Sequence, residues 1–545
     1  MIAPYLAGDR RSAARLALLV LVLSAAFQFA CFRRWPGNPM FDLGYSIFAA
    51  QNLIGHGKLV SLNMLTDYHD DLAQAAQLRF LVHFPPGQSL LYAAAMSLGL
   101  SAGAATRLLV LLGILAGGSG WICLARYLKA SAGCLLLLAL AYPWFPFTGS
   151  AYALYETEHV AAALMPWFCL LLLQLAPFAA RAGMDSRKVS VAQGTRLAGV
   201  ILLAVALVSF KYSMSPVFLA VALFLLVLDG WNVLRRPLWW KAVVIGLMVA
   251  PLLLGLAVNH AYGPRIMNTF PAPPHAALLF VRDAFENSIS TPFGWRSLAL
   301  RVFTVSRWQM AGLVVDILSL ALLTAFVLHL RRHPPRARMR RFAVLLALLT
   351  VALWFGLAAS NIAGQGQWNF STSDRLYMPI VSLWLLFALI SLASLRVWHL
   401  VRSPAFYLCA VPVALIALFM LKDSMFAPRH AAMPNSGIAW TDSRNPQDAR
   451  FLADFAASRA DRPDVMIGPS ALMNEIEVPT ISNGYFVPPG RHYWSSRPLE
   501  VWALVWPAQQ RKLLADFAGA EVERVATPPG YPFAFYVFKM PARGR

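Results

Sequence analysis

The polar residues best suited to chemistry lie between the first two apolar stretches, in residues 33–102. Asp42 occurs in Phe41-Asp42-Leu43-Gly44-Tyr45, and His83 precedes Pro85-Pro86-Gly87. A carboxylate at a membrane surface can take a proton from a hydroxyl, and a cationic or polar group can hold a departing phosphate. Asp42 suits the first role and His83 the second. Each also has a purely structural interpretation, Asp42 as a helix N-cap and Pro85-Pro86 as a helix start.

Two cationic residues much later in the chain are further candidates for holding a phosphate. Lys211 separates two short apolar runs in Ser209-Phe210-Lys211-Tyr212-Ser213, and Arg375 follows Asp374 at the entry to a late apolar run. An arginine keeps its charge at the mouth of a membrane helix and suits a phosphate. Alternatively, Lys211 snorkels to the interface, and Arg375 anchors the span there together with Tyr377.

A third group of candidates consists of carboxylates. Glu158 lies at the start of an apolar run without a basic neighbour, and Glu156 lies two residues before it. Placing an unpaired carboxylate in a membrane span costs free energy, so such a residue often has a function. The alternative role of Glu158 is to cap the following helix together with Thr157. The acids of the apolar part gather on one predicted side of the membrane, which suggests an active face there. Sorting of positive charge to the other side would also explain that asymmetry. These acids are Asp42, Asp67, Asp70, Asp71, Glu156, Glu158, Asp283, Glu286 and Asp374.

Metal ligands are sparse in the sequence. Asp67, His69 and Asp70 could bind a divalent metal, although one histidine among acids in a polar loop is more often simply solvated. The five cysteines lie in or beside apolar runs and show no metal-ligand spacing. A divalent metal is therefore the one cofactor that the sequence leaves open.

The composition sets the class of protein that must position these residues. Hydrophobic residues make up 59% of the 545 residues and charged residues only 13%. Soluble domains carry about 25% charged residues, so most of this chain is expected in lipid. The net charge of +21 resides in short loops between apolar runs, with no basic, aromatic-rich soluble surface, which argues against nucleic-acid binding.

The apolar runs predict a polytopic α-helical membrane bundle. About eleven runs have a length that suits a membrane span. They occupy 12–32, 103–125, 131–149, 158–178, 196–210, 213–229, 242–261, 309–330, 342–360, 376–395 and 404–422. Positive charges fall in alternate loops only if the short segment 86–100 does not cross. This topology places the protein in a bacterial inner membrane, with the N-terminus in the cytoplasm and the C-terminus outside. The first apolar run is expected to stay in the protein as an uncleaved helix.

The chain changes character after about residue 425. Pro, Gly and Asp become common, and the pattern predicts a helix over 448–458, a buried strand over 464–468, a helix over 507–517 and a strand over 533–538. We therefore expect residues 426–545 to form a small extracytoplasmic α/β domain.

The order of the motifs over residues 1–425 resembles the C-type integral-membrane glycosyltransferase superfamily. Its members include lipid A aminoarabinose transferases, protein O-mannosyltransferases and rhizobial lipopolysaccharide glycosyltransferases. The resemblance rests on an ordered set of motifs: Phe41-Asp42-Leu43-Gly44-Tyr45, then Phe84-Pro85-Pro86-Gly87, then Glu158, then Arg375-Leu376-Tyr377-Met378-Pro379.

The resemblance implies a transmembrane glycosyltransferase domain with a polyprenyl-phosphate sugar as donor and transfer on the outer face. By the same implication Asp42 is the catalytic base and Arg375 lies near the donor phosphate. From their chemistry, Lys211 and His83 are further candidates for holding that phosphate. Glu156, Glu158 and Asp374 would lie on the acceptor side. Two alternatives remain open. One is a transporter of an amphipathic lipid, to which Asp316 and the break between apolar runs at Lys211 point, and the other is a non-catalytic envelope assembly protein.

Overall fold

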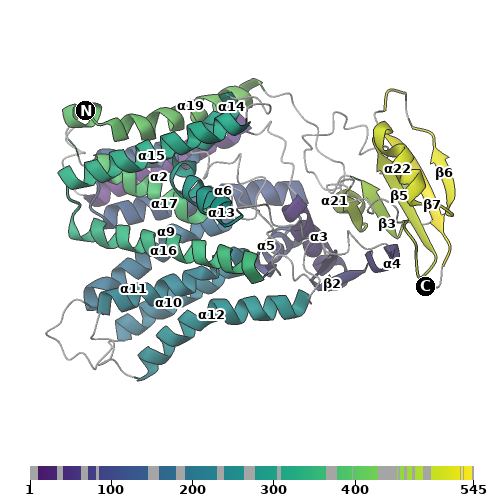
Figure 1. The fold of residues 1–545 in the computed structure, drawn as a ribbon, viewed down its shortest axis with the longest axis horizontal. Coiled ribbons are helices and arrows are strands. Elements are labelled where there is room, and N and C mark those ends of the chain that lie inside the picture. Colours follow the sequence, from purple (N-terminus) through teal and green to yellow (C-terminus); the bar gives the residue numbers. More distant parts are fainter. Residues whose placement is uncertain are drawn as a thin grey trace.

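The structure is a computed structural model of the 545-residue chain, and its elements are labelled in Figure 1. The residues that it describes are 10–32, 41–62, 71–75, 77–80, 85–144, 159–179, 191–229, 238–262, 276–302, 308–363, 377–393, 395, 397–426, 451, 454–458, 463–468, 473–482, 492–527, 529–531 and 533–542.

Most of the described residues form helices, which lie side by side in a bundle (Figure 1). The helices of the bundle are α2 (Arg10–Phe32), α6 (Ala102–Tyr127), α7 (Ala132–Ala141), η2 (Tyr142–Trp144), α9 (His159–Ala179), α10 (Val191–Phe210), η3 (Tyr212–Met214), α11 (Pro216–Asp229), α12 (Leu238–Tyr262), α13 (Ala276–Ile289), η5 (Thr291–Phe293), α14 (Trp295–Val302), α15 (Trp308–Arg332), α16 (Ala337–Ala363), α17 (Met378–Ala393), α18 (Val397–Val401) and α19 (Pro404–Phe426).

A helix occupies each position where the sequence predicts a membrane span. Among the described residues, four stretches are long and apolar enough to cross a bilayer: Ser12–Ala30, Ala102–Tyr127, Met310–Arg332 and Ala337–Ala358. The other predicted spans correspond to apolar helical stretches of 10–17 residues. The helical bundle is therefore confirmed, while the number of crossings stays a prediction.

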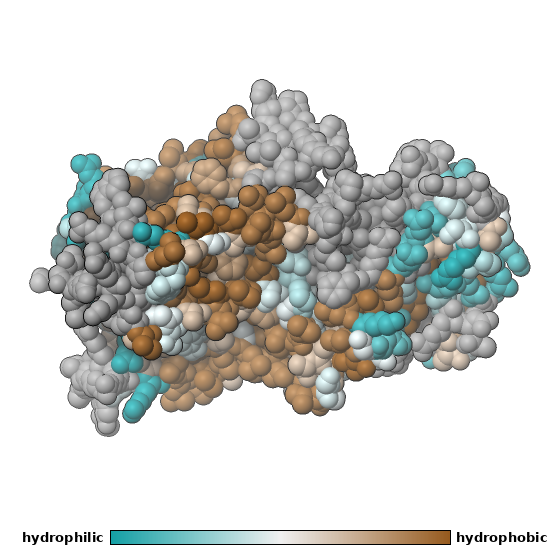
Figure 2. Space-filling view, turned by 90° about the horizontal axis from the view of Figure 1, so that it is seen from below, coloured by the Kyte–Doolittle hydropathy of each residue, from teal (hydrophilic) through white to brown (hydrophobic). Residues whose placement is uncertain are grey.

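The outside of the bundle is apolar. Large hydrophobic side chains are exposed along its helices, among them Leu23, Leu252, Leu313 and Leu418. Figure 2 shows apolar residues over the bundle and hydrophilic residues gathered over the sheet at the far end. Exposed apolar surface of this extent is stable only in contact with lipid or another protein, so the chain is a membrane protein.

Short elements follow the first helix. They are α3 (Phe41–His56), β1 (Val60–Leu62), α4 (Leu72–Ala75), β2 (Leu78–Phe80) and α5 (Pro86–Ser97). β1 pairs antiparallel with β2, and α3 packs on α5 through Leu43, Ile47 and Tyr92. α5 has 12 residues, about 18 Å of helix, which is shorter than a hydrocarbon core of about 30 Å. Several predicted spans are similarly short among the described residues, so the topology in which 86–100 does not cross stays a prediction.

The C-terminal part forms one mixed five-stranded sheet with the strand order β4-β3-β5-β7-β6. Its elements are β3 (Val465–Gly468), α21 (Met473–Ile476), β4 (Thr480–Ser482), β5 (Leu499–Val505), η9 (Pro507–Gln509), α22 (Gln510–Asp516), β6 (Glu521–Val525) and β7 (Ala534–Met540). β3 pairs parallel with β4 and β5, while β7 pairs antiparallel with β5 and β6. The predicted strands at 464–468 and 533–538 and the predicted helix at 507–517 are confirmed, and residues 454–458 of the predicted first helix are helical.

Candidate functional site

The predicted base lies at the beginning of a short helix. α3 begins at Phe41, so Asp42 belongs to its first turn. The partial positive charge at a helix N-terminus stabilises a carboxylate there. α3 packs on α5, so the helix whose first turn contains Asp42 lies against the helix that follows His83 in the sequence.

The first turn of α5 lies directly against the end of α10. A Cβ atom on Gly87 would lie 2.5 Å from the backbone oxygen of Ser209, so only glycine allows this approach. Lys211 follows two residues later, and its backbone N–H donates to the oxygen of Leu207 at 3.0 Å. The start of α5 and the end of α10, which directly precedes Lys211, therefore meet in the fold.

The same turn of α5 carries polar side chains that have no partner within the described part of the chain. Gln88 is 1% exposed and Ser89 is fully buried. Neither amide atom of Gln88 nor the Ser89 hydroxyl has a hydrogen-bond partner there. Buried polar atoms are nearly always hydrogen-bonded, so this turn offers donors and acceptors for a polar ligand or water.

Most of the other predicted site residues lie outside the described residues, and their roles stay predictions. They are His83, Glu156, Glu158, Asp374, Arg375 and the possible metal ligands Asp67, His69 and Asp70. Within the described ranges, no group of three or more His, Cys, Asp and Glu residues could hold a metal ion.

The helices that directly follow two of these segments come together. α9 begins one residue after Glu158, and α17 begins three residues after Arg375. Ala162 of α9 packs against Met378 of α17, both buried. The chain therefore enters neighbouring helices after Glu158 and after Arg375.

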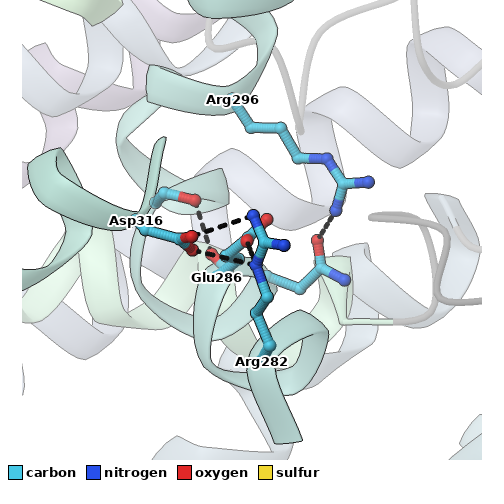
Figure 3. A network of polar contacts seen from close by, with 6 residues as sticks. Arg282, Glu286, Arg296 and Asp316 are labelled. Atoms are coloured by element: carbon cyan, nitrogen blue, oxygen red, sulfur yellow. Dashed lines mark hydrogen bonds and ion pairs between the residues drawn. The ribbon is translucent and has the colours of Figure 1, made fainter. Parts of the chain in front are cut away.

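A network of ion pairs joins α13 to α15 beside these helices (Figure 3). The Arg282 Nε–H donates to Glu286 Oε1 at 2.8 Å, and Arg282 Nη2 lies 2.8 Å from Asp316 Oδ2. Gly312 makes room for this guanidinium, because a Cβ there would lie 2.7 Å from Arg282 Nη2. One arginine thus forms ion pairs with carboxyl groups from two different helices.

A second arginine and a buried tyrosine lie near α13. Arg296 of α14 donates through Nη1 to the side-chain oxygen of Asn287. Tyr377, 1% exposed, is the residue before α17, and the charges of Asp283 and Arg296 act on its hydroxyl. That hydroxyl has no hydrogen-bond partner within the described residues. Arg296 therefore adds a cation to the surroundings of Tyr377.

The C-terminal part of α16 contacts both the segment after Lys211 and helix α13. Gly356 of α16 packs against Pro216, which follows Lys211 and η3. The Trp354 indole N–H donates to the Ser288 hydroxyl of α13 at 2.9 Å. The turn at Lys211 and the α13 network therefore lie on either side of one helix end. Among the described residues, the segment after Lys211 and the α13 helix of the ion-pair network both contact this helix end, although they come from distant parts of the sequence.

Sequence reasoning noted the acids of the network but missed its arginines and Asn287. The available signal is the spacing of Arg282 and Glu286, which are four residues apart and therefore share a helix face. Asp316 stands out as a carboxylate within an apolar run. Nothing in the sequence pairs it with Arg282, 34 residues earlier.

Burial raises the pKa of the Glu286 carboxyl from 4.5 to about 7, with a further increase from its hydrogen bond with Asp316 and the charge of that residue. Arg282 and Arg296 oppose the shift. The remaining charged group of α13 is Asp283, and α17 brings the Tyr377 hydroxyl. Since the folded state holds this proton more tightly than the unfolded state, the free energy of unfolding should fall as pH rises from about 4.5 to about 7.

The Glu286→Gln variant tests this pH dependence. Its stability should lack the decrease between pH 4.5 and 7 that the unchanged protein shows in thermal unfolding in detergent. An unaltered pH profile in the variant would assign the decrease to another group.

No protein-family model and no curated protein matches the chain. Among solved structures, it is similar to a cryo-electron microscopy structure of a variant of the arabinofuranosyltransferase AftD from mycobacteria, with 14% sequence identity and a TM-score of 0.44. The aligned region covers 98% of this chain and 42% of that one, so the chain spans less than half of that protein's length.

Proposed function

We propose that the chain is a membrane glycosyltransferase that moves a sugar from a polyprenyl-phosphate donor to a lipid, glycan or protein acceptor on the outer face of a bacterial inner membrane. The observation that carries this proposal is the meeting of α5 with the α10 end at Gly87 and Ser209. It connects the segment that contains Lys211 to the packed pair of α3 and α5, and the first turn of α3 contains Asp42. This connection supports a site in which the proposed base and a proposed phosphate ligand belong to neighbouring elements.

In the proposed reaction, Lys211, Arg375 and His83 hold the donor phosphate, and Arg296 adds positive charge beside the Arg375 segment. Asp42 takes the proton of the acceptor hydroxyl, whose oxygen then attacks the anomeric carbon of the sugar. The bond from that carbon to the phosphate oxygen breaks, and its electron pair leaves with the phosphate. Attack from the opposite face inverts the anomeric configuration.

The proposed topology has eleven crossings, a cytoplasmic N-terminus and an extracytoplasmic domain formed by residues 426–545. Glu156, Glu158 and Asp374 then face the acceptor side. The structure weakens the main argument for a transporter, because Asp316 is paired with Arg282 and is not an isolated charge inside a span.

The experiment is transfer from a panel of radiolabelled polyprenyl-phosphate sugars in membranes with and without the chain. Label that reaches a lipid, glycan or protein only when the chain is present supports the proposal and identifies the class of acceptor. Absence of transfer from every donor, with the protein folded, would favour lipid transport.

A further inference from the structure

The short helix α4 belongs to the loop between α2 and α6, here called the first outer loop, and it packs into the core of the C-terminal sheet. Leu72, the first residue of α4, is fully buried among Val465, Leu499 and Phe517, and Ala73 packs in the same cluster. α22 contributes Leu513 to this cluster, on one face of the sheet. The sheet thus completes its core with a residue from the N-terminal part of the chain.

Hydrogen bonds fix this contact in a defined register. The Leu72 backbone N–H donates to the oxygen of Trp494 at 2.9 Å. Asp71, 3% exposed, accepts through Oδ1 from the N–H of Ala73 at 3.0 Å and from the N–H of Ser496 at 3.2 Å. The same carboxylate oxygen therefore caps α4 and bonds it to Ser496, in the segment that precedes β5.

A helix on the other face of the sheet also contacts the first outer loop. α21, whose Ile476 belongs to the cluster on that face, lies against α3. The loop is consequently held at two places by elements from opposite faces of the sheet. One of these places is the helix whose first turn contains Asp42.

α4 has only four residues and cannot be stable as an isolated helix. Its stability must come from the sheet, and the sheet in turn needs Leu72 to fill its core. We propose that the C-terminal sheet is a clamp for the first outer loop, with residues 71–75 as its latch, and that closing this clamp fixes the position of the Asp42 helix. Only the consequence for Asp42 rests on the proposed function; the clamp itself does not.

The experiment uses the full chain with a protease site inserted between α19 and β3 and an affinity tag at the N-terminus. After cleavage in detergent, the C-terminal fragment should stay bound to the tagged membrane fragment. The Leu72→Asp variant should release it about ten- to a hundredfold faster, the change expected for losing one buried leucine. Leu78→Asp is the matched control, because Leu78 lies in the same loop but is 39% exposed, and it should retain the fragment.

Two substitutions at Asp71 provide a second test of the contact in case Leu72→Asp does not fold. Asp71→Asn keeps an acceptor for the two N–H groups and should retain the fragment, whereas Asp71→Ala should release it faster. Equal release from all variants, or immediate release from the unchanged protein, would overturn the clamp.

Transfer measured on the same cleaved samples separates the clamp from the proposed function. Transfer that persists while the fragment is bound and stops when it leaves supports both. Latch-dependent retention without transfer from any donor supports the clamp and counts against the glycosyltransferase.

Discussion

Asp42→Asn is expected to lower the rate of sugar transfer by about 10²- to 10⁴-fold, the usual contribution of a general base. The amide keeps the size of the side chain and can still accept a hydrogen bond at the start of α3, but it cannot take a proton from an acceptor hydroxyl. The measurement is the initial rate of transfer at saturating donor, together with the melting temperature in detergent, which should change little.

Glu521→Gln provides a matched control for this change. It makes the same exchange of carboxylate for amide on β6, where Glu521 is exposed, and should leave transfer unchanged. Full activity of Asp42→Asn would remove Asp42 from the mechanism, even if the chain proves to be a transferase.

Arg282→Ala is expected to lower the free energy of unfolding by about 1–3 kcal/mol, between the values for an exposed ion pair and for a buried one. The intermediate value applies because the Arg282 side chain is 43% exposed, whereas that of Glu286 is only 7% exposed. Without the guanidinium, the adjacent carboxyl groups of Glu286 and Asp316 lose their cationic partner. Thermal unfolding in lipid nanodiscs measures the loss.

Two further variants show whether the charge is the cause. Adding Glu286→Gln to Arg282→Ala should recover part of the lost stability, because one uncompensated carboxylate is removed. Arg332→Ala, at the exposed end of α15, the helix that carries Asp316, should have little effect. Additive losses in the double variant would mean that Arg282 stabilises the fold through packing alone.

The bundle could be predicted from the sequence because apolar runs of membrane length determine both the helices and their positions. β3 could be predicted for a related reason, since Val465–Gly468 is a short apolar run that ends in a turn. β5 was missed. It is buried on both faces except at Glu500, so it lacks the alternation of a half-buried strand. β6 was missed because its residues are exposed and charged, as in many edge strands.

The polar network and the latch could not be predicted because both depend on distant pairing. The sequence shows Asp316 as a charge in an apolar run, but only the packing of α13 on α15 reveals Arg282 as its counter-ion. Leu72 appears as one apolar residue in a polar loop. Its burial depends on a sheet that begins almost four hundred residues later.

That separation makes the loop between α2 and α6 dependent on a part of the chain that is synthesised much later. Asp71 and Ser496 are 425 residues apart, and at about 5–20 residues per second the ribosome needs roughly 20–85 s to make the intervening chain. During this time Leu72 has no sheet to pack against and α4 has no reason to be helical. The nascent protein therefore passes through a period in which its first loop is open to proteases and chaperones, and this period ends only when the final strands arrive.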